Sequence, residues 1–137
     1  MKAPLLIVDD DEAIRTQMKW ALSPDYELLF AEDRAEAVEV FRNGNPTVTL
    51  LDLGLPPDVN ECKEGIATLA ELLALDSTAK IIIISGQAEK ENALQAVGAG
   101  AYDFLSKPVE IEELRLLLRR CIYVADLERE YRQIQQS

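Results

Sequence analysis

Short apolar runs alternate with longer amphipathic stretches along this chain. The short runs are bounded by turn residues, which is typical of strands buried on both faces of a parallel sheet. The longer stretches carry apolar residues three and four positions apart, as in an amphipathic helix. Strands that alternate with helices favour right-handed βαβ units, so the pattern predicts an α/β domain with a parallel sheet between two layers of helices. The expected strands cover residues 5–8, 26–31, 48–52, 80–84 and 102–105.

The expected helices are marked by their ends as well as by their spacing. Asp33 and Glu36 form a capping-box pair, and Gly44 is expected to end the same helix. A long polar loop over residues 57–64 precedes the third helix. The last helix is expected to begin near Glu110 and to continue towards the end of the chain. The other helices are expected over residues 12–22, around 66–73 and over 89–97.

The third apolar run stops at Asp52, with Gly54 and Pro56 close behind it. Asp52 is therefore expected at the carboxyl end of a buried strand, the edge at which open α/β sheets bind ligands. There a carboxylate can hold a cation, or act as a nucleophile towards phosphorus. It can also be an ordinary turn residue that accepts backbone hydrogen bonds. Asp52 alone does not decide between these uses.

Polar side chains also follow the other expected strands. Asp9 and Asp10 follow the first strand, Ser85 the fourth and Lys107 the fifth. In a parallel sheet these strand ends share one edge with Asp52, where three carboxylates repel one another and raise at least one pKa. A divalent cation removes that conflict, and Mg²⁺ suits such a site. With a lysine and a hydroxyl to contact phosphoryl oxygens, the set predicts a phosphoryl-transfer site around a carboxylate nucleophile.

Composition narrows the class of protein. The chain has 137 residues, 48% of them apolar, and a net charge of −11. It is long enough for one domain with a sizeable core, and it is too acidic to contact nucleic acid directly. It has no apolar run of the roughly 20 residues needed to span a bilayer, and its N-terminus lacks the layout of a signal peptide. With Cys62 and Cys121 far apart and no His, we expect neither a zinc site nor a disulfide framework, and we expect a cytoplasmic location without membrane contact.

Four fragments of the sequence, taken together and in order, resemble the receiver domain of bacterial two-component response regulators over about residues 4–120. The resemblance implies a flavodoxin-like (βα)5 three-layer sandwich with a parallel sheet in the order 2-1-3-4-5. It also implies a cis peptide bond between Lys107 and Pro108. The fragments are Ile7-Val8-Asp9-Asp10, Leu51-Asp52-Leu53-Gly54-Leu55-Pro56, Ile84-Ser85-Gly86 and Phe104-Leu105-Ser106-Lys107-Pro108.

The resemblance assigns a role to each acidic residue of the site. Asp52 would accept the phosphoryl group, which a sensor histidine kinase would donate. Mg²⁺ would be bound directly by Asp10, Asp52 and the backbone carbonyl of Gly54, with Asp9 acting partly through water. The chain would thus be a phospho-acceptor rather than an enzyme, although it would assist its own phosphorylation and dephosphorylation.

The resemblance also assigns the switch. Lys107 would pair with the phosphoryl group, Ser85 would follow it, and the ring of Phe104 would turn inward when Ser85 shifts. One feature departs from the family pattern. Many receivers have a Gly four residues after the Pro that corresponds to Pro56, whereas the next Gly here is Gly65, so the loop after Asp52 is longer.

Finer features resemble receivers of the nitrogen-regulator type, and those of the PEP-CTERM exopolysaccharide group. In the former, the receiver precedes a sigma-54-dependent ATPase and a DNA-binding domain. The resemblance therefore implies a receiver over residues 1–121 and a helical linker over residues 122–137 that leads towards an output domain outside this chain. The output would control transcription.

Three other functions were weighed. Haloacid-dehalogenase-type phosphatases need a second carboxylate two residues after the first, where this chain has Gly54. A flavodoxin-like FMN carrier needs a phosphate loop after the first strand, where Asp9, Asp10 and Asp11 would repel phosphate. A receiver-like interaction module that is never phosphorylated would not need the complete set of site residues.

The last helix carries two apolar faces. Leu114, Leu118, Cys121 and Ile122 form one face, suited to packing on the sheet. A second set, interrupted by Arg120, follows alternating three- and four-residue steps and predicts a coiled-coil seam, and hence a homodimer. A solvated, frayed helix is the alternative, because isolated helices of this length are marginal. The predicted seam is Leu117, Val124, Leu127, Tyr131 and Ile134.

Overall fold

The computed structural model describes residues 2–56 and 62–136 and contains the predicted α/β fold. The strands are β1 (Ala3–Val8), β2 (Tyr26–Ala31), β3 (Val48–Asp52), β4 (Lys80–Ser85) and β5 (Asp103–Ser106). The helices are α1 (Glu12–Leu22), α2 (Arg34–Gly44), α3 (Lys63–Leu75), α4 (Lys90–Gly98) and α5 (Ile111–Gln136), with a short 3-10 turn, η1 (Gln87–Glu89). All strand pairs are parallel, and their order is β2-β1-β3-β4-β5, as predicted.

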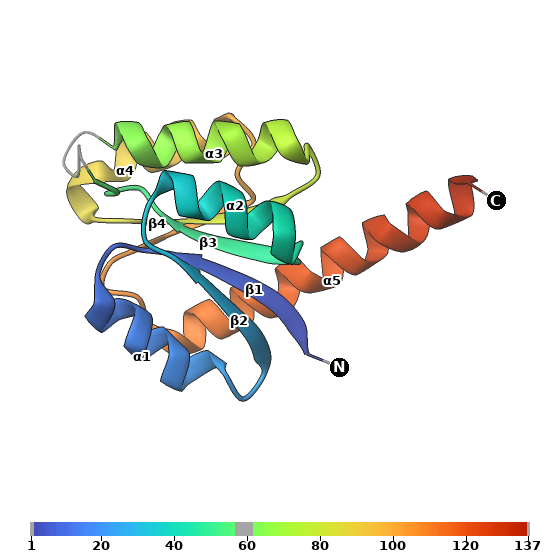
Figure 1. Cartoon of the computed structure of the whole chain (residues 1–137), viewed down its shortest axis with the longest axis horizontal. Coiled ribbons are helices and arrows are strands. Elements are labelled where there is room, and N and C mark those ends of the chain that lie inside the picture. The colour runs from blue at the N-terminus through green and yellow to red at the C-terminus, as the bar shows by residue number, and fades with distance from the viewer. Residues whose placement is uncertain (1, 57–61, 137) are drawn as a thin grey trace.

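The sheet is buried on both faces, which explains the continuous apolar runs of its central strands. Helices α2, α3 and α4 cover one face, and α1 and α5 cover the other (Figure 1). Successive residues of β1 point into different layers: Leu6 and Val8 pack in one apolar cluster, Leu5 and Ile7 in the other. Most of the long loop predicted at residues 57–64 lies outside the described residues.

Several element ends differ from the sequence prediction. Gly44 is the last residue of α2, and the left-handed cap is Asn45 with φ 45°, a conformation that Asn tolerates. The Asp33 side chain accepts the Glu36 N–H as expected, but the Glu36 carboxylate accepts from Glu32 N–H, so the predicted capping box is half formed. The fifth strand begins at Asp103, one residue later than predicted, although the Tyr102 N–H already donates to the Ile81 carbonyl of β4.

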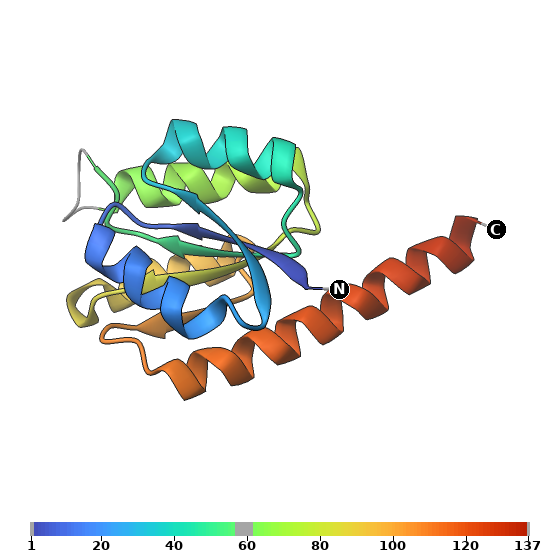
Figure 2. The same cartoon turned by 60° about the horizontal axis from the view of Figure 1, so that its bottom comes forward.

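Helix α5 has two parts with different surroundings. Its first part packs under the sheet, and its second part continues past the edge of the domain (Figure 2). Leu114, Leu118 and Cys121 are buried as predicted. Leu117 is buried with them, so its assignment to an outward seam was wrong, because one turn of helix presents both Leu117 and Leu118 to the sheet layer. Among the described helices, none is both long enough and apolar enough to cross a membrane.

An ion pair ties the projecting part of α5 back to the sheet. The Lys80 Nζ, at the start of β4, donates to the Glu128 Oε1 at 3.0 Å. One turn later, the Arg132 Nη1 donates to the Thr78 Oγ1 at 3.2 Å. The Lys80 side chain is 15% exposed, so this pair is better shielded from water than a typical surface pair. These contacts keep the helix direction fixed beyond the last core residue.

Replacing Glu128 with Ala should loosen the projecting part of α5 without unfolding the domain. Loss of the ion pair should cost about 0.5–1 kcal/mol of local stability, because the pair is only partly desolvated. Hydrogen exchange of amides in residues 123–136 should then be roughly twofold to fivefold faster. Glu130→Ala is the matched control, since Glu130 is exposed on the same helix. Equal exchange in the two variants would show that the Lys80 contact does not hold the helix.

Candidate phosphoryl-transfer site

The parallel register brings the predicted site residues to one edge of the sheet. Val8 pairs with Leu51, and Asp52 pairs with Ile84, so Asp9, Asp52 and Ser85 lie at neighbouring levels on three adjacent strands. Ser85 pairs with Ser106, which places Lys107 just beyond the end of β5. The sequence predicts this meeting because parallel strands end at the same edge.

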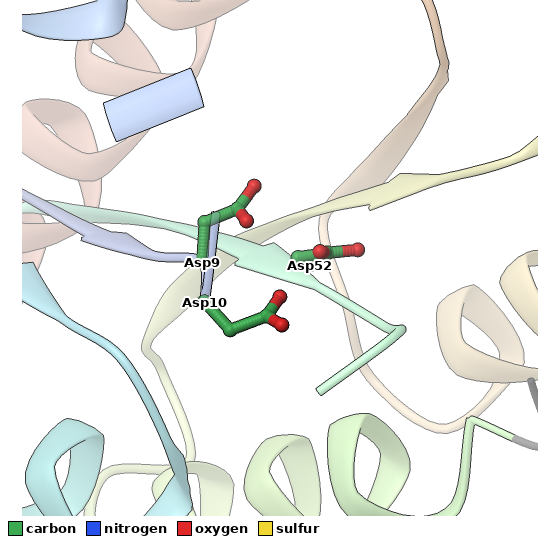
Figure 3. A group of neighbouring side chains, drawn as sticks. All are labelled: Asp9, Asp10 and Asp52. Carbon is green, nitrogen blue, oxygen red and sulfur yellow. The ribbon is translucent and has the colours of Figure 1, made fainter. Parts of the chain in front are cut away.

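Three carboxylates form the centre of the site. Asp9 and Asp10 extend from the end of β1, and Asp52 from the end of β3 (Figure 3). One oxygen from each carboxylate lies within 4.8 Å of the others. Asp9 and Asp52 are buried, whereas Asp10 is exposed to solvent. The site is therefore open to solvent beside Asp10 and shielded from solvent at Asp9 and Asp52.

Few positive or donor groups offset this negative charge. The Asp52 Oδ1 accepts the Gly54 N–H at 3.1 Å, and its Oδ2 accepts from the Lys107 Nζ at 3.2 Å. Burial raises the pKa of Asp52 despite these two donors. Burial also raises the pKa of Asp9 to about 6, and the Asp52 carboxylate adds to this, although the Asp11 N–H opposes it. Repulsion between buried carboxylates is thus left partly uncompensated.

This donor set fits Mg²⁺. The cation prefers carboxylate oxygens and water, and three convergent carboxylates with one open side offer both. Burial, together with the charge of Asp52, raises the pKa of Asp9, and a divalent cation at this place would favour its charged form. The role predicted for the Gly54 carbonyl and the water-mediated role of Asp9 stay predictions.

Ser85 and Lys107 complete the predicted set. Ser85 is fully buried, and its hydroxyl has no hydrogen-bond partner among the described residues. Such an orphaned group is costly to bury, so it indicates a donor that is kept for another acceptor. The Lys107 N–H donates to the Ser85 carbonyl at 2.8 Å, and the Lys107–Pro108 bond is cis, as predicted. Phe104 is half-buried against the layer of α2, α3 and α4, and its role in a switch stays a prediction.

Backbone packing fixes the position of Asp52. Gly65, in the first turn of α3, lies so close to Leu53 that a Cβ atom would overlap the Leu53 backbone. Only Gly allows this approach, which seats α3 directly on the segment after Asp52. The late Gly of the sequence pattern therefore has a packing role.

Sequence reasoning missed other residues at this edge. The Arg15 Nη1 donates to the Asp9 backbone carbonyl at 2.7 Å, and its Nη2 pairs with Glu32 at 3.1 Å. The Glu89 side chain accepts the N–H of Gly86, the residue after Ser85. Arg15 lies one turn inside α1, so its helical position was a usable signal, and Glu89 lies three residues after Gly86, the spacing of a capping box.

Comparison with known families agrees with this geometry. The sequence profile of the response regulator receiver domain matches residues 5–119. The chain is 28% identical over 134 residues to the regulatory protein AtoC of Escherichia coli, covering 97% of this chain and 28% of AtoC. It is 34% identical over 120 residues to the transcriptional regulatory protein KdpE of Staphylococcus aureus, covering 87% of this chain and 49% of KdpE. The chain thus spans less than half the length of these two relatives.

Solved structures give the same picture. Crystal structures of NtrX from Brucella abortus, one of them in complex with ADP, superpose with a TM-score of 0.87 at 30% identity, over 98% of this chain and 29% of NtrX. The separate receiver domain of NtrX superposes with a TM-score of 0.79, over 87% of this chain and 98% of that domain.

Without a divalent cation, stability should fall as the pH rises through the range in which Asp9 titrates. The folded chain holds the Asp9 proton up to a pKa of about 6, whereas an unperturbed Asp releases it near 3.8. The folded state therefore binds more protons between these values, so the free energy of unfolding decreases with rising pH, by at most about 3 kcal/mol.

Urea denaturation in EDTA, at about pH 4 and about pH 7, would measure this effect. Asp9→Asn should be more stable than the unaltered protein at the higher pH, and its stability should depend less on pH. Adding Mg²⁺ should stabilise the unaltered protein most. Asp25→Asn, at an exposed position away from the site, is the control. A variant without Asp9 that keeps the full pH dependence would contradict the assignment.

Proposed function

This chain belongs to the response regulator receiver domain family, and we propose that it is a phosphorylation-dependent signalling switch with Asp52 as its phospho-acceptor. The observation that carries this proposal is the position of Asp52. Its carboxylate is buried beside two other carboxylates and is bonded to Lys107. In this family the chain is a phospho-acceptor module rather than an enzyme.

The proposed reaction is an in-line transfer to Asp52. A carboxylate oxygen of Asp52 attacks the phosphorus atom of a phosphohistidine on a sensor histidine kinase. The phosphorus–nitrogen bond breaks, and the imidazole nitrogen keeps the electron pair. Asp10, Asp52 and the Gly54 carbonyl, with Asp9 acting partly through water, would hold Mg²⁺, which would supply positive charge to neutralise the phosphoryl oxygens. Lys107 is already bonded to the carboxylate and follows the charge to a phosphoryl oxygen.

The proposed switch starts at Ser85. Its buried hydroxyl lacks a partner among the described residues, so a phosphoryl oxygen on Asp52 offers the acceptor that it needs. A shift of Ser85 towards that oxygen would leave space behind it, and the ring of Phe104 would turn inward to fill it. Phosphorylation would then be read out on the face formed by α4, β5 and α5.

The proposed output is a domain outside this chain. AtoC and KdpE are named as regulatory proteins, NtrX was crystallised with ADP, and this chain covers a fraction of each. These likenesses support a transcription activator with an ATPase and a DNA-binding domain, of the sigma-54-dependent type. With a net charge of −11, the receiver itself would not touch DNA. The expected cytoplasmic location belongs to the same proposal.

A homodimer through α5 is part of this proposal, with a corrected contact face. Leu127, Tyr131 and Ile134 of the predicted seam are exposed, but Leu117 is buried. The stripe instead begins with Leu116 and Tyr123, which are 55% and 65% exposed. These residues follow one another at steps of seven, four, four and three positions, which keeps them on one face of the helix, and the stripe covers both parts of α5. A second copy of the chain offers the matching stripe.

A receiver-like module that is never phosphorylated remains the alternative function. Its site would not need a carboxylate cluster, a bonded lysine and an orphaned hydroxyl at one place. The two functions differ in one measurable property, covalent labelling of Asp52.

Incubation with acetyl phosphate and Mg²⁺ should add one phosphoryl group per chain, seen by intact mass spectrometry. Asp52→Asn should abolish the mass gain, because its amide is a poor nucleophile and cannot form the acyl phosphate. Asp103→Asn is a matched control, since Asp103 lies at the start of β5 and is not part of the carboxylate cluster. Full labelling of Asp52→Asn would sink the assignment, and an unlabelled native protein would favour the alternative function.

Light scattering should find a dimer at tens of micromolar protein, because even a modest interface associates at this concentration. A chain that ends at Cys121 should be monomeric, because it lacks most of the exposed stripe. Leu127→Glu in the full chain should also shift the equilibrium to monomer, since it places a charge in the apolar contact. If the full chain is itself monomeric, the dimer through α5 is wrong.

A further inference from the structure

Glu89 closes the turn that follows the buried serine. The Gly86 N–H donates to the Glu89 Oε2 at 3.3 Å, and the Glu89 N–H donates to the Gly86 carbonyl at 3.0 Å. The Glu89 residue thus holds the turn η1 from both its side chain and its backbone. Gly86 follows Ser85 directly, so this contact sits beside the hydroxyl that lacks a partner among the described residues.

The Cys62 thiol, at the N-cap of α3, is fully buried. Burial, reinforced by the nearby Glu89 carboxylate, raises the pKa of Cys62 to about 11. The thiol therefore stays protonated and is not a reactive group.

Glu89 lies outside the cluster of Asp9, Asp10 and Asp52. It is a further carboxylate beside the end of β4, in the turn η1, an element that the phosphoryl chemistry does not use.

We propose that Glu89 is a latch that stabilises the unphosphorylated arrangement of the turn after β4. Its carboxylate takes up the Gly86 N–H. A backbone N–H in a tight turn is a donor that suits a phosphoryl oxygen. Glu89 and a phosphoryl group on Asp52 therefore compete for the same N–H group. This inference rests on the proposed function of Asp52.

The contacts are suited to being broken. At 3.3 Å, the Gly86–Glu89 hydrogen bond is at the long end of the normal range, so it is easily exchanged for a better one. A phosphoryl group carries nearly two negative charges and repels the Glu89 carboxylate. Release of Glu89 would free η1 and the start of α4. Glu89 is therefore a positioning residue for the switch and not a catalytic residue.

The test measures the rate of phosphorylation by acetyl phosphate and Mg²⁺, followed by intact mass. Glu89→Ala should be phosphorylated roughly threefold to tenfold faster than the unaltered protein, the range of one hydrogen bond. Glu89→Gln should lie between the two, because its amide oxygen is a weaker, neutral acceptor for the Gly86 N–H. Glu91→Ala is the matched control: it removes the same charge from an exposed position in the first turn of α4 and should change the rate less than twofold.

A second measurement follows the Gly86 amide by NMR. In the unphosphorylated protein, Glu89→Ala should move this amide signal and speed its hydrogen exchange, whereas Glu91→Ala should not. Phosphorylation of the unaltered protein should likewise move the Gly86 signal, because the amide changes its acceptor. Circular dichroism establishes that each variant is folded. If Glu89→Ala does not fold, the comparison of phosphorylation rates is made with Glu89→Gln.

The outcomes separate the latch from the proposed function. Equal rates for the Glu89 and Glu91 variants, or slower phosphorylation without Glu89, would overturn the latch while Asp52 remains the acceptor. A Gly86 amide signal that is unchanged in Glu89→Ala would overturn the latch as well. If the unaltered protein gains no mass, the proposed function itself fails, and the latch fails with it.

Discussion

Repulsion between carboxylates that are forced together at the end of a buried sheet is the interaction on which this structure depends. Asp9 and Asp52 are held on adjacent parallel strands and are both nearly removed from water. Lys107 offsets part of their negative charge. Burial and the charge of Asp52 still raise the pKa of Asp9. Because of this repulsion, the site responds strongly to any added charge, whether a divalent cation or a phosphoryl group. The same repulsion lowers the stability of the domain when no cation is bound.

Strand β4 connects this site with the opposite end of the domain. Its last residue, Ser85, lies beside Asp52, and its first residue, Lys80, holds Glu128 of α5. The two ends of one short, fully buried strand therefore touch the phospho-acceptor site and the projecting helix. Rigid elements of this kind transmit a displacement with little loss, because a close-packed core does not absorb it. Strand β4 thus connects the site directly to helix α5.

The relatives put this arrangement in context. The receiver domain occupies a minor share of AtoC and NtrX and about half of KdpE, whereas it makes up nearly all of the separate NtrX receiver. A receiver that works with different outputs needs a common reactive site and a variable surface through which it signals. Here the reactive site is the carboxylate cluster. The signalling surface consists of helix α5, with its exposed stripe and its ion pair to Lys80, and of the turn that Glu89 holds.

The sequence by itself determined the fold and the members of the central site. Each strand is a local apolar run that ends at a polar residue, and parallel strands bring those ends to one edge, so Asp9, Asp10, Asp52, Ser85 and Lys107 could be grouped without a structure. The tertiary structure alone decided features that depend on how distant elements approach. It buried Leu117 under the sheet and moved the exposed stripe to Leu116 and Tyr123, because helical spacing fixes which residues share a face but not which face meets the core. It brought the turn that holds Glu89 near Cys62, because no local pattern encodes the distance between a turn after one strand and the start of a helix that follows another.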